Sequence, residues 1–253
     1  NFAYGATGTL AAVLVAKMVI DWNWPYVPAL LVGVAASAAV AGAIEMTVVR
    51  RLFDSARITL FVATIGAAQL VTVLSINVPR VEGVGTPFPT PFSGTWQLGD
   101  DITVHAPQVM ALVAIPLVAF GLGWFLNRTI WGIAITATAA NPDASRLAGL
   151  STRRVSTLVW VLAGALAGVT TVLAVPLRST PVNNLAAGSG IQLLVIALAV
   201  ALLARMRSLV LAVVAGVVVG MVERVVFYNW ANQSGLIEFV LLGIVLGAVL
   251  FAH

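Results

Sequence analysis

The chain contains no cysteine, and only 9% of its 253 residues are charged. The absence of cysteine excludes disulfide bonds, thiolate metal sites and cysteine nucleophiles. A soluble domain carries about 25% charged residues, so this sequence has too few charges to cover a surface exposed to water. Because 60% of the residues are apolar, the composition instead predicts a protein whose solvent is the lipid bilayer.

Catalytic motifs are missing as well. The two histidines, His105 and His253, have no serine–aspartate pair or cluster of metal ligands near them in the sequence. The sequence also holds no HExxH motif and no GxxxxGK[ST] phosphate loop. We therefore expect no enzymatic activity, no metal site and no cofactor, and the chain by itself has no motif for hydrolysing ATP.

Long apolar runs dominate the sequence. Each must form a helix if it lies in hydrocarbon, because every backbone N–H and C=O group there needs an internal partner. We predict an all-α polytopic membrane protein with one transmembrane domain over 1–253, trimmed at both ends. A spanning helix needs about 20 mostly apolar residues, and we predict eight transmembrane helices, over 3–20, 28–49, 58–78, 107–126, 155–177, 189–204, 208–228 and 236–252.

The arginines predict the orientation of these runs. Nine arginines fall in the loops after the second, fourth and sixth runs, and two fall in the odd-numbered loops. Basic residues concentrate in cytoplasmic loops, so we place the even-numbered loops in the cytoplasm. This pattern explains the basic residues without a nucleic-acid partner. Five aromatic residues are predicted anchors at the membrane interfaces: Trp22, Trp24, Tyr26, Tyr228 and Trp230.

The longest loop, over 79–106, lies on the predicted outer side. Pro87, Pro89 and Pro91 exclude a helix there. Further along, Gly99-Asp100-Asp101 stands between apolar residues. We expect a small hairpin over 95–104 with these residues at its turn.

Three pairs of glycines stand four residues apart inside apolar runs. Small residues at this spacing let two helices approach closely in lipid. Each pair therefore predicts a helix face in close contact with a neighbour: Gly164 with Gly168, Gly216 with Gly220, and Gly243 with Gly247.

Polar residues inside the runs are costly in lipid and are functional candidates. Thr64 and Gln69, in the third run, are candidates for the transport pathway, and hydrogen bonding between helices is the alternative. We expect Glu45 to extend toward the cytoplasmic interface and pair with Arg50 or Arg51. A second interface pair is expected between Lys17 and Asp21, and a third between Glu223 and Arg224. The absence of a chain of buried carboxylates argues against proton-coupled transport.

The fourth loop, over 127–154, carries the strongest local signals. Asn141 is a favourable helix N-cap, Pro142 a favourable first residue, and Asp143 complements the helix dipole. Gly149 is a typical residue for ending a helix. We predict a helix of about two turns in the cytoplasm. It is either a rigid knob that fits a groove of a soluble partner or a connecting helix on the membrane surface.

Four stretches resemble, in order, motifs of the permeases of branched-chain amino-acid ABC importers of bacteria. They are Asn1-Phe2-Ala3-Tyr4-Gly5, Ala63-Thr64-Ile65-Gly66, the loop from Gly132 to Leu150, and Ala163-Gly164-Ala165-Leu166-Ala167-Gly168. The resemblance extends over the whole chain. It departs from the family at Leu202–Ser208, where the family has a glycine-rich loop, at Tyr4, where histidine is frequent, and at Ser145, where the family has alanine.

The resemblance implies a role for two groups of residues. The fourth-loop helix would dock on an ATP-hydrolysing subunit as a coupling helix, formed by Asn141, Pro142, Asp143, Ala144, Ser145, Arg146, Leu147 and Gly149. The transport pathway would include Tyr4, Thr64, Gly66 and Gln69.

The resemblance also implies a place and partners for the chain. It would lie in the bacterial plasma membrane with a second permease subunit, two ATPases and an extracytoplasmic substrate-binding protein, and an upstream hydrophobic segment would precede it. The expected function is import of branched-chain or related amino acids, or of urea, amides or small carboxylates. A secondary transporter, a channel and a structural assembly protein are the alternatives from other classes.

Overall fold

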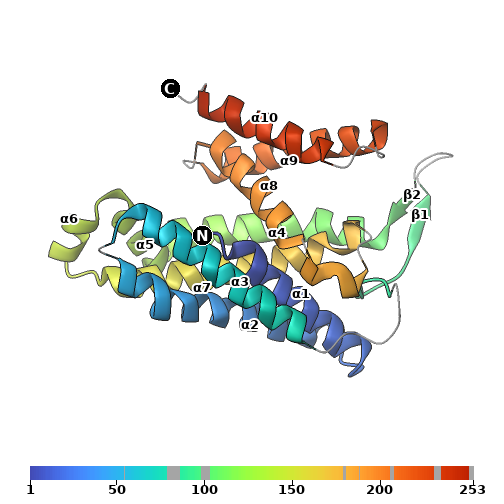
Figure 1. Cartoon of the computed structure of the whole chain (residues 1–253), viewed down its shortest axis with the longest axis horizontal. Helices are drawn as coiled ribbons and strands as arrows, with labels where there is room; N and C mark the ends of the chain where they lie inside the picture. The colour runs from blue at the N-terminus through green and yellow to red at the C-terminus, as the bar shows by residue number, and fades with distance from the viewer. Residues whose placement is uncertain are drawn as a thin grey trace. The chain divides into compact units, whose positions relative to one another are not determined.

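The computed structural model describes residues 1–53, 55–78, 86–97, 103–178, 181–187, 189–205, 208–230 and 235–250. Most of them are helical (Figure 1). By their internal contacts they form two compact units, Asn1–Gly190 and Ile191–His253, which are described separately. The single membrane domain expected over 1–253 stays a prediction.

The first unit holds seven helices among the described residues. The α2 helix continues into a π-helical turn, η1 (Glu45–Val49), and a 3-10 turn, η2 (Arg50–Leu52). Two further 3-10 turns, η3 (Pro176–Arg178) and η4 (Val182–Ala187), follow the last helix. The helices are α1 (Tyr4–Ile20), α2 (Tyr26–Ile44), α3 (Arg57–Asn77), α4 (Ala106–Arg128), α5 (Ile130–Ala140), α6 (Pro142–Leu147) and α7 (Thr152–Ala174).

A short antiparallel hairpin precedes α4. Its strands are β1 (Thr95–Gln97) and β2 (Thr103–His105), and Trp96 is paired with Val104. The two strands confirm the predicted hairpin. The expected turn at Gly99-Asp100-Asp101 lies outside the described residues, as do Arg80, Glu82, Arg207 and His253.

The second unit consists of α8 (Ser189–Leu203), α9 (Leu209–Asn229) and α10 (Leu236–Leu250). The Ser208 hydroxyl oxygen accepts a hydrogen bond from the backbone N–H of Leu211 at 3.4 Å and so caps α9. Many large apolar side chains on α9 are exposed, among them Val210 and Met221. Such a surface is stable in lipid and not in water.

Every predicted apolar run contains a helix in the structure. Within the described residues, five of the eight predicted spans are long and apolar enough to cross a membrane: Tyr26–Leu52, Ile58–Asn77, Ala106–Arg128, Thr152–Arg178 and Leu209–Asn229. Apolar helices of 10–17 residues include Tyr4–Ile20 and Leu194–Leu203. The fold is therefore all-α, as predicted.

The sequence prediction omitted one helix, α5, in the fourth loop. This 11-residue segment carries no charge and follows α4 after a single break at Thr129. The Thr129 hydroxyl oxygen accepts a hydrogen bond from the backbone N–H of Gly132 at 3.0 Å and starts the new helix. The segment is too short to span a membrane, so the search for runs of about 20 residues missed it.

Helices α1, α2 and α7 pack against one another through small residues. A Cβ atom placed on Gly164 of α7 would lie 2.7 Å from the Ser37 carbonyl oxygen of α2. The buried Ser37 hydroxyl donates a hydrogen bond to the Gly164 carbonyl at 2.7 Å. A Cβ atom on Gly168 would lie 3.2 Å from Ala11 of α1. The prediction of a close-contact face at Gly164 and Gly168 is confirmed.

The other two glycine pairs behave differently. Among the described residues, nothing lies within 4 Å of a Cβ atom placed on Gly220, Gly243 or Gly247, and Gly216 meets only Val200 at 3.8 Å. The prediction of close contacts at these pairs was wrong within the described chain. Spacing alone does not specify a partner, and among the described residues only Val200 of α8 comes within 4 Å of a Cβ atom placed on one of these glycines.

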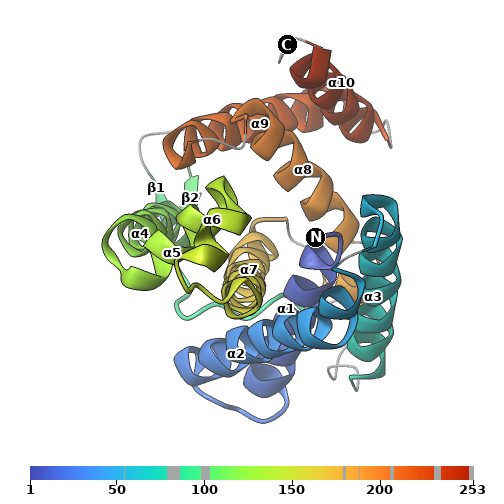
Figure 2. The same ribbon diagram turned by 90° about the vertical axis from the view of Figure 1, so that its left-hand side faces the viewer.

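The loops of the first unit lie at opposite ends of its helices. Helices α5 and α6 lie at one end, and the hairpin lies at the other (Figure 1). Figure 2 views the molecule from the side of α5 and α6, with α7 behind them. The arginine-rich loop after α4 is thus separated from the hairpin by the length of the membrane-crossing helices, as alternating crossings require.

Candidate functional site

Local hydrogen bonds define both ends of α6. The Asn141 side-chain oxygen accepts a hydrogen bond from the backbone N–H of Ala144 at 3.0 Å, and Pro142 is the first helical residue. At the other end Gly149 has a φ of +83°, which favours glycine because it has no Cβ atom. The Gly149 and Leu150 N–H groups donate to the carbonyls of Arg146 and Ser145. These bonds form a Schellman motif, so the predicted helix is confirmed with its predicted caps.

The α6 helix presents an apolar side chain to its surroundings. Leu147 is 91% exposed, and the Asp143 side chain is 89% exposed. Asp143 and Arg146 approach to 3.8 Å, and such an exposed pair contributes only about 0–1 kcal/mol. Ser145, in contrast, is buried and donates to the Asn141 carbonyl at 2.9 Å. The helix therefore offers an exposed leucine flanked by one charge of each sign.

Short connections attach α6 to two longer helices. The α5 helix itself turns sharply away from α4. A Cβ atom on Gly132 would lie 2.2 Å from the Phe125 carbonyl oxygen, so only glycine fits the corner between α4 and α5. On the α7 side, the Ser151 hydroxyl oxygen accepts from the Arg154 N–H and caps α7. Arg146 Nε donates to the Thr152 hydroxyl at 3.4 Å. The α6 helix is therefore bonded directly to the start of α7.

The four predicted pathway residues do not form one cluster. Thr64 is buried and donates to the Phe61 carbonyl of its own helix at 2.9 Å, whereas Gln69 is exposed. Residues five apart differ by about 140° around an α-helix, so their side chains point in different directions. A Cβ atom on Gly66 would meet nothing within 4 Å in the described chain.

The fourth pathway residue, Tyr4, approaches another helix. Its hydroxyl donates to the Thr170 hydroxyl of α7 at 3.4 Å. Thr170 is exposed, so this pair presents hydroxyl groups from two helices on one surface. Sequence reasoning missed Thr170, because a threonine inside an apolar helix usually bonds to its own backbone and gives no distinct signal.

Glu45 forms a buried network in place of the expected interface position. Its side chain is only 1% exposed, and its Oε2 atom lies 3.1 Å from Arg50 Nη2. The pairing with Arg50 is confirmed, but the extension of Glu45 toward the interface was wrong. The Thr157 hydroxyl of α7 also lies 2.7 Å from Glu45 Oε2, and this second partner supplies a further polar contact to the buried carboxylate. The expected pair of Lys17 and Asp21 is confirmed.

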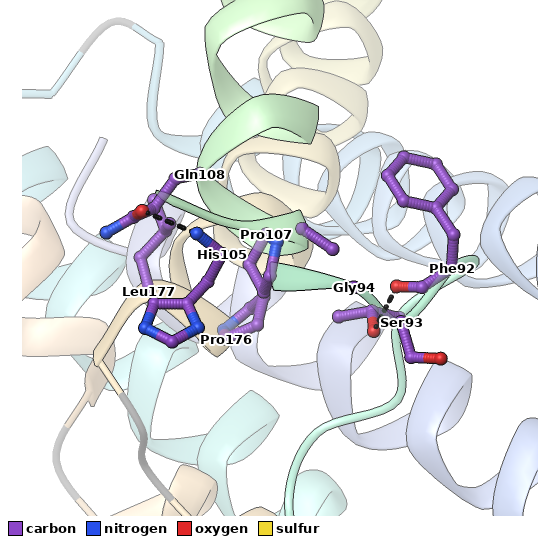
Figure 3. A pocket seen from close by; sticks show the side chains of 10 residues that line it. Phe92, Ser93, Gly94, His105, Pro107, Gln108, Pro176 and Leu177 are labelled. Atoms are coloured by element: carbon purple, nitrogen blue, oxygen red, sulfur yellow. Dashed lines mark hydrogen bonds between the residues drawn. The ribbon is translucent and has the colours of Figure 1, made fainter. Parts of the chain in front are cut away.

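A cavity of about 430 Å³ lies at the end opposite α6. Figure 3 shows His105 and Gln108 near Leu177, with Phe92 on the other side. The backbone N–H of His105 donates to the Gln108 side-chain oxygen at 2.9 Å. Among the described residues that line it, none carries a carboxylate, an ammonium or a guanidinium group. Their polar groups include the His105 ring and the Gln108 amide.

A comparison with protein families assigns the class of protein. Residues 1–252 match the model described as the branched-chain amino acid transport system, permease component. The chain belongs to this family of ABC transporter permeases, which is a transport family and not an enzyme class. The family resemblance read from the four sequence motifs is confirmed.

The curated relatives transport chemically different solutes according to their names. The chain is 36% identical over 80 residues to a nucleoside ABC transporter permease of Lactococcus lactis, covering 31% of this chain and 21% of the relative. It is 25% identical over 179 residues to a fructose import permease of Rhizobium meliloti, covering 66% of this chain and 47% of the relative. It is 27% identical over 119 residues to a protein named as a probable branched-chain amino acid transport permease of Methanocaldococcus jannaschii. This match covers 47% of this chain and 36% of the relative.

The chain therefore spans about half or less of the length of each of these three relatives. No solved structure matches the chain. The family is established by the full-length model match, and the substrate is not established by the relatives.

Proposed function

We propose that this chain is the membrane subunit of a bacterial ABC importer in the plasma membrane and that partner ATPases drive it through α6. The observation that carries this proposal is the capped α6 helix with its 91% exposed Leu147. An exposed leucine on a capped helix outside the spanning segments can serve as the aliphatic anchor that fills a pocket of a soluble partner. The family match supports ATPase and substrate-binding components as partners of the chain.

The proposed mechanism uses α6 as a lever. ATP binding brings two ATPases together, and each moves the α6 helix seated on it. Because α6 is joined to α7 by four residues and to α5 by Asn141 alone, its movement shifts helices of the first unit. Two permease subunits then alternate between outward-open and inward-open states. ATP drives this change to the extent that it binds one state more tightly than the other.

The proposed substrates are branched-chain or related amino acids. The family description supports this class, and so does the relative named for branched-chain amino acid transport. The relatives named for nucleosides and fructose make uncharged sugars and nucleosides the competing substrates. For the pathway we propose Tyr4, Thr64, Gly66 and Gln69, of which Tyr4 presents a hydroxyl together with Thr170.

The test of α6 uses the assembled transporter in liposomes with its ATPases and binding protein. We expect Leu147→Ala to lower substrate-stimulated ATP hydrolysis several-fold while affinity for the binding protein stays unchanged. Leu112→Ala is the matched control, because Leu112 on α4 is also an exposed leucine, at 75%, and lies in a spanning segment. Loss of stimulation in both variants, or in neither, would contradict the proposed role of α6.

The charged residues of α6 provide a second arm of this test. Because the pair of Asp143 and Arg146 contributes little to the stability of the isolated helix, Asp143→Ala and Arg146→Ala report mainly on contacts with the partner. We expect each to lower stimulated ATP hydrolysis. If the transporter purifies from native membranes without an ATPase, the importer proposal itself fails.

The substrate class is tested separately by competition. Uptake of labelled leucine into the same liposomes is measured with excess isoleucine, fructose or adenosine. Competition by isoleucine alone supports the amino-acid class. Absence of leucine uptake, with uptake of labelled fructose or adenosine into the same liposomes, would overturn the proposed substrate and leave the role of α6 intact.

A further inference from the structure

We propose that Glu45, Arg50 and Thr157 form a coupling latch that makes α2 follow α7 when α6 is displaced. The three residues are positioning residues and do not contact the solute. The inference rests on the proposed function, because it assumes that α6 receives the force of an ATPase. Two hydrogen bonds of the latch join Thr157 of α7 to Arg50 and Glu45 beyond the end of α2, and a third joins Arg50 to Glu45.

The π-turn η1 brings the two charged residues of the latch together. In a regular α-helix Arg50 would lie about 140° around the axis from Glu45. In the structure the Arg50 N–H instead donates to the Glu45 carbonyl, five residues earlier. This wider turn places Arg50 above Glu45, and Arg50 Nη2 donates to Glu45 Oε2 at 3.1 Å. Single π-turns inside helices are frequent at functional sites.

Thr157 extends the pair across to α7. Arg50 Nη2 donates to the Thr157 hydroxyl oxygen at 2.7 Å. The Thr157 hydroxyl in turn lies 2.7 Å from Glu45 Oε2 and 3.0 Å from the Arg153 carbonyl of its own helix, and its single proton can be donated to the nearer carboxylate. Each residue of the latch therefore contacts the other two. The carboxylate is buried, so separation of α7 from α2 would remove one of its two partners in a medium where an unpaired charge is costly.

The latch lies close to the point where α6 delivers its movement. Thr157 is the sixth residue of α7, and α6 ends five residues before α7 begins. Beyond the latch, α2 and α7 are in close contact at Gly42, where a Cβ atom would lie 2.9 Å from Val161, and at Gly164. The latch thus holds α2 and α7 together at the end nearest α6. Without it, a displacement of α6 would separate the two helices first at this end.

The experiment measures solute transported per ATP hydrolysed by the assembled transporter. Thr157→Val preserves the shape of the side chain and removes the hydroxyl, and we expect the ratio to fall about fivefold or more. Thr157→Ser keeps the hydroxyl and should restore the wild-type ratio. Glu45→Gln removes the charge and should lower the ratio as well. Thr72→Val is the matched control, since the Thr72 hydroxyl donates only to the Ala68 carbonyl of its own helix.

A purely structural role predicts a different pattern. Thr157→Val would then lower the melting temperature, while the ratio of solute to ATP would stay unchanged in the protein that remains folded. An unchanged ratio in both Thr157→Val and Glu45→Gln would overturn the latch. Leu147→Ala in the same preparation separates the two proposals. If Leu147→Ala uncouples and the latch variants do not, only the latch fails, and if Leu147→Ala has no effect, the role of α6 fails.

Discussion

Two regions of this chain contain the same glycine spacing with opposite structural results. In α7, Gly164 and Gly168 lie against α2 and α1 so closely that an added Cβ atom would meet backbone or side-chain atoms within 2.5–3.4 Å. In α9 and α10, among the described residues, Gly220, Gly243 and Gly247 meet nothing within 4 Å. A glycine pair therefore permits close packing, but whether packing occurs depends on whether another helix has a matching small surface.

The α7 face has such a matching surface in Ser37, Ala38 and Ala41 of α2. Ser37 donates a hydrogen bond to the Gly164 carbonyl, which is an interaction between helices and not within one. In lipid, close packing and hydrogen bonds of this kind provide most of the force between helices, because apolar burial contributes little there. The contrast between the two regions is therefore a difference in stability that can be measured.

The largest loss of stability is expected for Gly164→Leu. The side chain would collide with the Ser37 carbonyl oxygen at 2.7 Å and with Ala41 at 2.5 Å, and backbone cannot move aside without separating the helices. Overpacking costs about 1–3 kcal/mol and occasionally more. We expect a clear fall in the thermal unfolding midpoint in detergent. Gly220→Leu is the control, and an equal fall in both variants would remove the contrast between the regions.

An intermediate effect is expected for Gly33→Ala. A Cβ atom there would lie 2.5 Å from Val15 Cγ2 and 3.0 Å from the Ala11 carbonyl oxygen. The closest clash involves a side chain, so Val15→Ala should relieve part of it. In a double-mutant cycle, the loss in free energy of unfolding of the double variant should be about 0.5–1 kcal/mol smaller than the sum of the losses of the two single variants. Additive changes would mean that the backbone contact alone is responsible.

A smaller effect is expected for Ser37→Ala. Its hydroxyl bonds to a different helix, and such hydrogen bonds in membranes average about 0.6 kcal/mol. Ser75→Ala is a matched control, because Ser75 is also buried but donates to the Val71 carbonyl of its own helix. Urea or SDS titration of folded protein should show a larger loss for Ser37→Ala. A larger loss of stability for Ser75→Ala would show that a hydrogen bond within one helix contributes more than the bond between helices.

The smallest effect is expected for Gly243→Ala. The added methyl group meets nothing within 4 Å in the described chain. We expect the unfolding midpoint of the isolated chain to change by an amount equivalent to less than about 0.5 kcal/mol, the usual range for substitutions away from close contacts. A large loss in the isolated chain would show that this face is packed, against the structure.

Some features were predictable because their causes are local in the sequence. Asn141, Pro142 and Gly149 define α6 through hydrogen bonds and backbone angles within nine residues. The pair of Lys17 and Asp21 lies on one turn of one helix. The apolar runs predicted helices because the bilayer leaves the backbone no other partner.

Other features were missed because their causes lie in the packing of distant segments. The pair of Glu45 and Arg50 was predicted, but its burial and its bonds to Thr157, 112 residues away from Glu45, were not. No spacing rule connects Thr157 to this pair. Helix α5 was missed for a different reason, since an apolar run of 11 residues does not match the template of a spanning helix. The pathway candidates Thr64 and Gln69 were grouped by nearness in sequence, whereas the helix places them on different faces.

The sequence by itself determined the solvent of this protein, its helical class and the form of α6, because composition, run length and capping act over short stretches of chain. The tertiary structure alone decided which glycine faces are packed and which carboxylate is buried. These outcomes depend on atoms of other helices that meet at distances of a few ångströms, and a linear pattern carries no record of which surfaces meet.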